Sequence, residues 1–173
     1  MSEWHEYFIK MARLVSTKSK DPSTKVGAVI VGEDNEVLST GFNGFPRGVA
    51  ETVQYPKGYA PSVSDLPPGK SPGDLLDRWE RPQKYQFVEH AERNAIYNAA
   101  RQGIRLKGSR MYLNWEPCPC VECTKAVIQA GIAQVIGPNK RFPGKGDHWQ
   151  LEQDVAQQML NESGVGRIKV NMK

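Results

Sequence analysis

Cysteine is scarce in this chain and is confined to one short stretch. The 173 residues include three cysteines, and all of them lie between Cys118 and Cys123. An odd number of cysteines in one cluster does not suit a framework of disulfides. The pattern is typical instead of a metal site in a reducing compartment. We therefore expect a metal-binding protein of the cytoplasm.

Long apolar runs are also missing. A helix that spans a bilayer needs about 20 consecutive apolar residues. The longest apolar run here, residues 26–31, suits a buried strand. Residues 1–6 lack the basic region and apolar core of a secretory signal. The sequence therefore predicts no membrane partner.

The charge of the chain is weakly basic and dispersed. There are 23 Lys and Arg against 19 Asp and Glu, which gives a net charge of +4. A small basic excess fits a phosphorylated substrate, a nucleic acid or a solvated surface with no partner. Because the basic residues form no run of about five or six, a nucleic-acid partner is not favoured.

The order of the predicted elements indicates one layered α/β domain over residues 1–173. An amphipathic helix is expected at 3–19, and two strands that form a hairpin follow it. From residue 89 onward, segments with a helical period alternate with short β-rich runs, which is typical of a sheet covered by helices. The expected helices are 89–102, 120–130 and 149–162. The last is predicted from Leu151, Val155 and Met159, which recur at helical spacing. The expected strands are 25–31, 36–41, 110–114, 133–136 and 165–170. We expect these five strands to form a mixed sheet.

Residues 45–86 interrupt this alternation. The stretch is rich in proline and glycine and shows little periodicity, but it also carries several aromatic residues. A long irregular segment inside a compact domain is usually either functional or disordered. Because of its aromatic residues, we interpret it as an ordered loop insertion with a helical turn at 74–79.

Two short motifs supply the parts of one reaction. His90-Ala91-Glu92 is followed, near residue 120, by Pro119-Cys120-Val121-Glu122-Cys123. This is the H-x-E and P-C-x-x-C pattern of zinc-dependent nucleobase deaminases. One imidazole and two thiolates can hold Zn²⁺ and leave the fourth tetrahedral position for water. The carboxylate of Glu92 is then available to move protons during hydrolytic deamination.

A purely structural zinc site is the alternative for these residues. It would need a fourth protein ligand, for which Cys118 is a candidate. However, Cys118 and Cys120 are separated by a single proline, which is a poor chelate geometry beside a C-x-x-C pair with the usual spacing. A structural site would also have no need of Glu92. We therefore expect Cys118 not to bind the metal.

The motifs and their surroundings resemble the cytidine-deaminase-like superfamily and, within it, the deoxycytidylate (dCMP) deaminases. The resemblance covers most of the chain and is carried by residues 21–31, 41–48, 90–96 and 123–132. It implies a three-layer α/β/α domain. It also implies that His90, Cys120 and Cys123 hold one catalytic Zn²⁺ and that Glu92 shuttles protons.

The resemblance further implies residues that contact the substrate. Asn43 would hydrogen-bond the deoxyribose or its phosphate side, and the backbone N–H of Ala91 would meet the pyrimidine carbonyl. Arg101 stands where the family can place a phosphate-binding arginine. A surface charge near the end of a helix is the other interpretation of Arg101, and the sequence leaves both open.

The implied function is conversion of dCMP to dUMP and ammonia, which feeds thymidylate synthesis. The alternatives are deamination of dCTP, cytidine or a tRNA adenosine, and a zinc-stabilised binding module without catalysis. By the same resemblance we expect a homo-oligomer, namely a hexamer, regulated by dCTP and dTTP. Mg²⁺ would help to bind the effector near Asn43 and Gly44.

Overall fold

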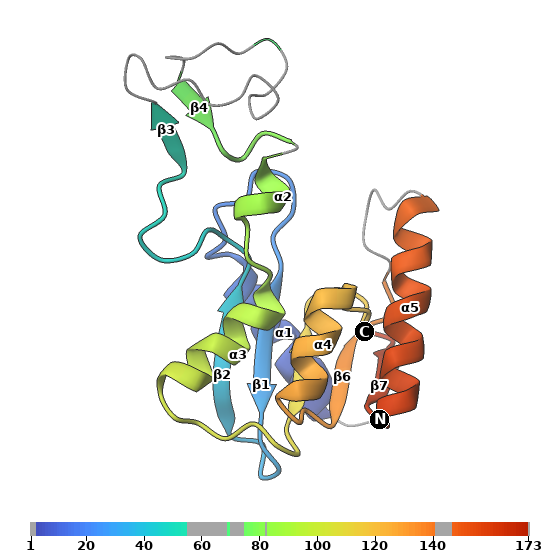
Figure 1. Cartoon of the computed structure of the whole chain (residues 1–173). Coiled ribbons are helices and arrows are strands. Elements are labelled where there is room, and N and C mark those ends of the chain that lie inside the picture. Colours follow the sequence, from blue (N-terminus) through green and yellow to red (C-terminus); the bar gives the residue numbers. More distant parts are fainter. Residues whose placement is uncertain (1–2, 55–68, 70–74, 82, 141–146, 173) are drawn as a thin grey trace. The chain divides into compact units, whose positions relative to one another are not determined.

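The computed structural model describes residues 3–54, 69, 75–81, 83–140 and 147–172. The chain forms two compact units (Figure 1). The first, here called the sheet unit, consists of Met1–Asn43 and His90–Lys173. The second, here called the inserted unit, consists of Gly44–Glu89. Each unit is described by itself.

A five-stranded mixed sheet, with strands in the order β2-β1-β5-β6-β7, is the centre of the sheet unit. Strand β1 (Gly27–Val31) pairs antiparallel with β2 (Val37–Phe42) and with β5 (Arg110–Leu113). Strands β5, β6 (Gln134–Pro138) and β7 (Gly166–Val170) run parallel. The predicted α/β fold with a mixed sheet of five strands is therefore confirmed.

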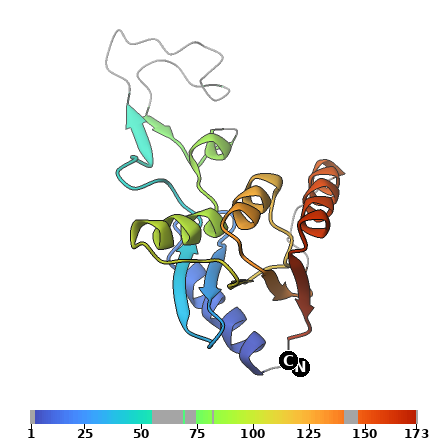
Figure 2. The same cartoon turned by 60° about the horizontal axis from the view of Figure 1, so that its bottom comes forward.

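Helices cover both faces of this sheet (Figures 1 and 2). Helix α1 (Glu3–Ser16) lies on one face, where Phe8 packs with Val29 and Tyr112. Helices α3 (Ala91–Arg101) and α4 (Val121–Gln129) lie on the other face. Because successive side chains of a strand point to opposite faces, the fully buried strand β1 contributes to both cores. This explains why its sequence is apolar throughout rather than alternating.

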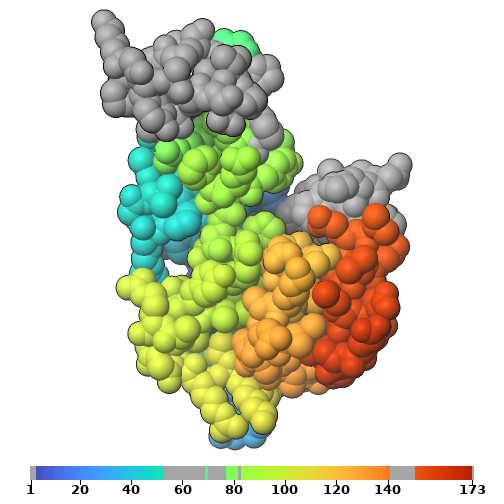
Figure 3. All heavy atoms as spheres, in the orientation of Figure 1, coloured from blue at the N-terminus to red at the C-terminus, as the bar shows by residue number. Residues whose placement is uncertain are grey.

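Helix α5 (Asp147–Ser163) lies beside α4, as Figure 3 shows in red and orange. The helix itself was predicted, but the row of Leu151, Val155 and Met159 is not its buried face. Leu151 is 70% exposed, whereas Ala156 and Leu160 are fully buried. The face that a helix buries depends on its neighbours as well as on its own apolar residues. Among the described residues, no helix is both long and apolar enough to cross a membrane.

The inserted unit has regular structure of its own. Strand β3 (Thr52–Gln54) pairs antiparallel with β4 (Leu75–Asp77), and a short helix α2 (Lys84–Phe87) follows. The helical turn predicted at 74–79 is wrong, because pairing with the distant strand β3 holds Leu75–Asp77 in an extended conformation. The aromatic rings of Phe45 and Trp79 stack with their centroids 4.4 Å apart. Residues 55–68 and 70–74 of the predicted loop lie outside the described residues.

Candidate active site

His90 is held at the start of helix α3. It is the N-cap of this helix, with extended backbone angles, so that its side chain stands at the helix N-terminus. The helix packs directly on strand β2 at Gly41, where a β-carbon would collide with backbone atoms of Ala91 and Ala95. In addition, the Asn94 side-chain Nδ2 donates to the Phe42 carbonyl at 2.8 Å. The sheet therefore fixes the position of the first turn of α3.

Cys120 is the N-cap of helix α4, and Cys123 lies in the first turn of that helix. The Cys120 sulfur accepts a hydrogen bond from the Cys123 backbone N–H at 3.5 Å. Residues 115–119 connect strand β5 to this helix and pass close to strand β6. At Gly137 a β-carbon would collide with the Trp115 carbonyl and lie 3.0 Å from the Pro117 nitrogen. Because Gly137 has no side chain, residues 115–119, here called the cysteine loop, can lie against strand β6.

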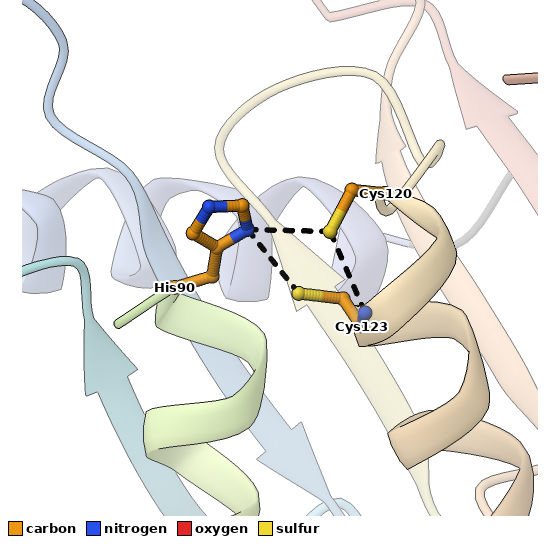
Figure 4. A group of neighbouring side chains, drawn as sticks. All are labelled: His90, Cys120 and Cys123. Carbon is orange, nitrogen blue, oxygen red and sulfur yellow. Dashed lines mark hydrogen bonds between the residues drawn. The ribbon is translucent and has the colours of Figure 1, made fainter. Parts of the chain in front are cut away.

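The two helix N-termini bring one nitrogen and two sulfurs together (Figure 4). The Nδ1 atom of His90 lies 3.4 Å from the sulfur of Cys120 and 3.4 Å from that of Cys123. All three potential ligand atoms lie within 4.8 Å of one another. In a tetrahedral zinc site, bonds of about 2.3 Å to sulfur and about 2.0–2.1 Å to nitrogen place these atoms about 3.5 Å apart. Both nitrogen–sulfur distances therefore match those of a tetrahedral zinc site.

The protonation of the metal-free triad follows from its hydrogen bonds. The hydrogen bond to Cys120 raises the pKa of His90 to about 9, although burial opposes this. The hydrogen bonds from Cys123 and His90 lower the pKa of Cys120 to about 4. The pKa of the Cys123 thiol is raised, first by its hydrogen bond to Cys120 and then by burial. At neutral pH the metal-free site thus holds an imidazolium, a thiolate and a thiol.

Glu92 lies next to the triad but outside it. Its side chain is 7% exposed, and burial raises the pKa of its carboxyl group. Among the described residues, the cluster of potential metal ligands consists of His90, Cys120 and Cys123 and includes neither Glu92 nor Cys118. A three-ligand cluster with a buried carboxylate at its side is the donor set of a catalytic zinc site, which keeps one position for water.

Two of the predicted substrate residues lie at the same end of the sheet as the triad. Ala91 opens helix α3 and is fully buried. Asn43 follows strand β2 and is also buried. The two N–H bonds of its amide are used within the chain, because Nδ2 donates to the Asp21 carboxylate at 2.9 Å and to the Thr24 carbonyl at 3.0 Å. The proposed contacts of both residues with a substrate stay predictions.

The structure separates Arg101 from the triad within one chain. Arg101 is an exposed residue in the last turn of α3, and the helical rise of about 1.5 Å per residue puts it about 16 Å from His90. A role in phosphate binding would therefore place it at a site some distance from the zinc ligands. Gly44 belongs to the inserted unit, where it pairs with Glu89 through backbone hydrogen bonds of 3.0 and 2.8 Å.

Two residues at this end of the sheet were not identified from the sequence. The positive charge of Arg93 lowers the pKa values of Glu92 and Cys123, although other effects outweigh it in both. Asn114 is buried at the end of β5, directly before the cysteine loop. An isolated asparagine or arginine carries no pattern that distinguishes it from a surface residue, so no sequence signal pointed to either.

Comparison with known proteins identifies the family. Residues 2–137 match the model of the cytidine and deoxycytidylate deaminase zinc-binding region. The chain belongs to this family. It is 36% identical to human deoxycytidylate deaminase over 163 residues, which cover 94% of this chain and 77% of the human protein. It is 35% identical to deoxycytidylate deaminase of Enterobacteria phage T2 over 147 residues, which cover 74% of this chain and 76% of the phage protein.

Solved structures agree with this assignment. The dCMP deaminase of cyanophage S-TIM5, in complex with dCMP and dUMP, is 25% identical and superposes with a TM-score of 0.64. The match covers 98% of this chain and 97% of the cyanophage chain. The protein is therefore a deaminase of the cytidine and deoxycytidylate deaminase family, and its His–Cys–Cys triad is a zinc site.

Proposed function

We propose that this enzyme hydrolyses dCMP to dUMP and ammonia. The observation that carries this proposal is the triad of His90, Cys120 and Cys123 beside the buried carboxyl group of Glu92. The names of the similar human and phage proteins support dCMP as the substrate. So does the similar cyanophage enzyme, whose structure contains dCMP and dUMP.

The triad would hold one Zn²⁺ through Nδ1 of His90 and the sulfurs of Cys120 and Cys123. When bound, this ion lowers the pKa of a coordinated water toward neutrality and so supplies a nucleophile at pH 7. Cys120 is the N-cap of α4, where the aligned peptide dipoles favour its thiolate. The N-terminus of α4 therefore stabilises Cys120 in the form that binds metal.

Glu92 moves the protons of the reaction. Its carboxylate accepts a proton from the attacking water and delivers it to ring nitrogen N3, which makes the amino-bearing carbon electrophilic. It then carries the second proton of the water to the amino group, which leaves as ammonia. Burial raises the pKa of this carboxyl group above its ordinary value, which makes the carboxylate a better proton acceptor than an exposed one.

Ala91 and Asn43 orient the nucleoside. The N–H of Ala91 lies in the first turn of α3, where backbone N–H groups have no acceptor within the helix, and it is suited to the pyrimidine carbonyl. The Asn43 Oδ1 atom accepts one hydrogen bond, from the Val26 N–H at 2.8 Å. An amide oxygen can accept two. Asn43 is thus suited to accept from a sugar hydroxyl rather than to donate to a phosphate.

The remaining features of the proposed enzyme rest on the family resemblance. The whole chain acts as one deaminase domain into which residues 45–86 are inserted. Arg101 binds the substrate phosphate. Because Arg101 lies far from His90 of its own chain, that substrate occupies the active site of a neighbouring subunit in a homo-oligomer such as a hexamer. The nucleotides dCTP and dTTP regulate the enzyme near Asn43 and Gly44, with Mg²⁺ on the effector phosphates. Three free thiols suit a reducing compartment such as the cytoplasm.

Ammonia release from a panel of substrates tests the proposal. Cytosine, cytidine, deoxycytidine, dCMP, dCTP and an RNA hairpin would be compared at equal concentration with the zinc-loaded enzyme. We expect the highest kcat/KM with dCMP. A higher value with any other compound would reject dCMP as the substrate and leave the zinc deaminase assignment intact. The same assay with dCTP or dTTP added, with and without Mg²⁺, tests the regulation.

A further inference from the structure

Two buried asparagines continue the sheet beyond the ends of its strands. Residues 24–26 precede strand β1 and lie beyond its paired positions, which end at Gly27 on the β2 side and at Ala28 on the β5 side. The backbone pairing on the two sides ends at Asn43 and Asn114. The Asn43 N–H donates to the Val26 carbonyl at 3.2 Å, and the Asn114 N–H donates to the Gly27 carbonyl at 3.3 Å. From there onward, side chains replace the missing strands.

On the β2 side, the amide of Asn43 bridges two backbone groups. Its Oδ1 atom accepts from the Val26 N–H at 2.8 Å, and its Nδ2 atom donates to the Thr24 carbonyl at 3.0 Å. The second Nδ2 hydrogen is held by Asp21, whose other carboxylate oxygen accepts from the Ser23 and Thr24 N–H groups at 2.8 and 3.0 Å. Asp21 is 2% exposed, so these bonds compensate for the burial of its charge.

On the β5 side, Asn114 makes the equivalent pair of bonds. Its Oδ1 atom accepts from the Gly27 N–H at 2.9 Å, and its Nδ2 atom donates to the Lys25 carbonyl at 3.1 Å. In an extended chain, the carbonyl of one residue and the N–H two residues later point to the same side. A carboxamide offers one acceptor and a donor beside it, so it bridges these two groups as a neighbouring peptide would.

This arrangement bears on the zinc site because Asn114 is the residue before the cysteine loop. The loop is tied to residue 25 a second time by the Trp115 Nε1–H, which donates to the Lys25 carbonyl at 3.2 Å. Within the loop, the Glu116 N–H donates to the carbonyl of Lys140, two residues after strand β6, at 3.1 Å. Its far end becomes the N-cap of α4, Cys120. Asn114 thus fixes the start of the loop that leads from strand β5 to the zinc ligand Cys120.

We propose that Asn114 is a positioning residue of the zinc site, which acts by holding the loop that presents Cys120 to the metal. Without its side chain, the buried Gly27 N–H and Lys25 carbonyl each lose a partner, and the start of the loop is free to shift. Loss of groups that orient metal ligands typically lowers metal affinity about 10- to 100-fold. The inference rests on the zinc site of the proposed function but not on its substrate.

The test is zinc transfer from the holoenzyme to a chromophoric chelator. We expect Asn114→Ala to weaken the zinc affinity about 10- to 100-fold. We also expect it to alter the thiolate-to-metal absorption band of the cobalt-substituted protein. Asn161→Ala is the matched control, because Asn161 is an exposed residue of α5 whose oxygen accepts from Gln157 at 2.8 Å. It should leave both readouts unchanged. Zinc affinity of Asn114→Ala within twofold of the unmodified enzyme would overturn the proposal.

A second variant decides the question if Asn114→Ala does not fold. In Asn114→Asp the ionised carboxylate still accepts from the Gly27 N–H but opposes the Lys25 carbonyl. At pH 8 the zinc affinity of Asn114→Asp should therefore be lower than that of the unmodified enzyme, because the carboxylate has no N–H to donate to the Lys25 carbonyl. A zinc affinity of Asn114→Asp within twofold of the unmodified enzyme would refute the role of the amide donor and overturn the proposal.

Discussion

Replacement of Glu92 by glutamine separates proton transfer from metal binding. The two side chains have nearly the same size, so the change leaves the packing around this 7% exposed residue intact. Glu92 lies outside the cluster of His90, Cys120 and Cys123, so the zinc content should not change. The substituted amide cannot accept a proton from water near pH 7. Only the proton transfers of the reaction should therefore be lost.

The expected loss in kcat follows from the number of steps in which Glu92 takes part. A general acid–base group usually contributes about 10²- to 10⁴-fold to the rate. Because Glu92 serves both ring protonation and departure of ammonia, we expect the upper end, about 10⁴-fold. This corresponds to about 5.5 kcal/mol of activation free energy at 1.36 kcal/mol per factor of ten. Burial raises the pKa of Glu92, so a neutral amide at this position should not lower the Tm.

The assay measures kcat for dCMP by ammonia release, together with the zinc content per chain. The matched control is Glu122→Gln. Glu122 occupies the same second position of its helix, α4, but it is exposed and pairs with Lys125 at 2.6 Å. This control should keep its activity. If the Glu92 variant retains zinc and its kcat is within tenfold of the unmodified enzyme, the assigned role of Glu92 is wrong.

Three further changes test the site and the substrate. Cys120→Ala should lose zinc and activity, whereas Cys118→Ala should keep about one zinc per chain by metal analysis; equal loss from both would make Cys118 a ligand. Zinc binding to the metal-free protein at pH 7 should release about two protons, one from His90 and one from Cys123, because both hold protons above neutrality and metal ligands must give them up. Calorimetry in buffers of different ionisation enthalpy measures this number, and release of no protons would contradict the assigned protonation states. Arg101→Glu should lower kcat/KM for dCMP about 10- to 100-fold but spare deoxycytidine, since a charge-assisted hydrogen bond contributes about 1.5–3 kcal/mol; equal losses on both substrates would indicate a role in the fold or in an interface.

The sequence alone identified the zinc ligands because each half of the site is local. Cys120 and Cys123 are spaced so that one helical turn presents both sulfurs, and His90 and Glu92 share the start of another helix. Strong periodicity and apolar runs likewise predicted the five strands and the helices that cover them. Short-range spacing and local propensity determine such features before any tertiary contact forms.

Only the tertiary structure decided which distant segments meet. Pairing with β3 made Leu75–Asp77 a strand, and the position of α5 left Leu151 exposed. Asn43 and Asn114 converge on residues 24–27 only because β1 lies between β2 and β5. Each of these features depends on contacts between residues far apart in the chain. Such contacts determine which buried polar groups form hydrogen bonds and which apolar faces are covered.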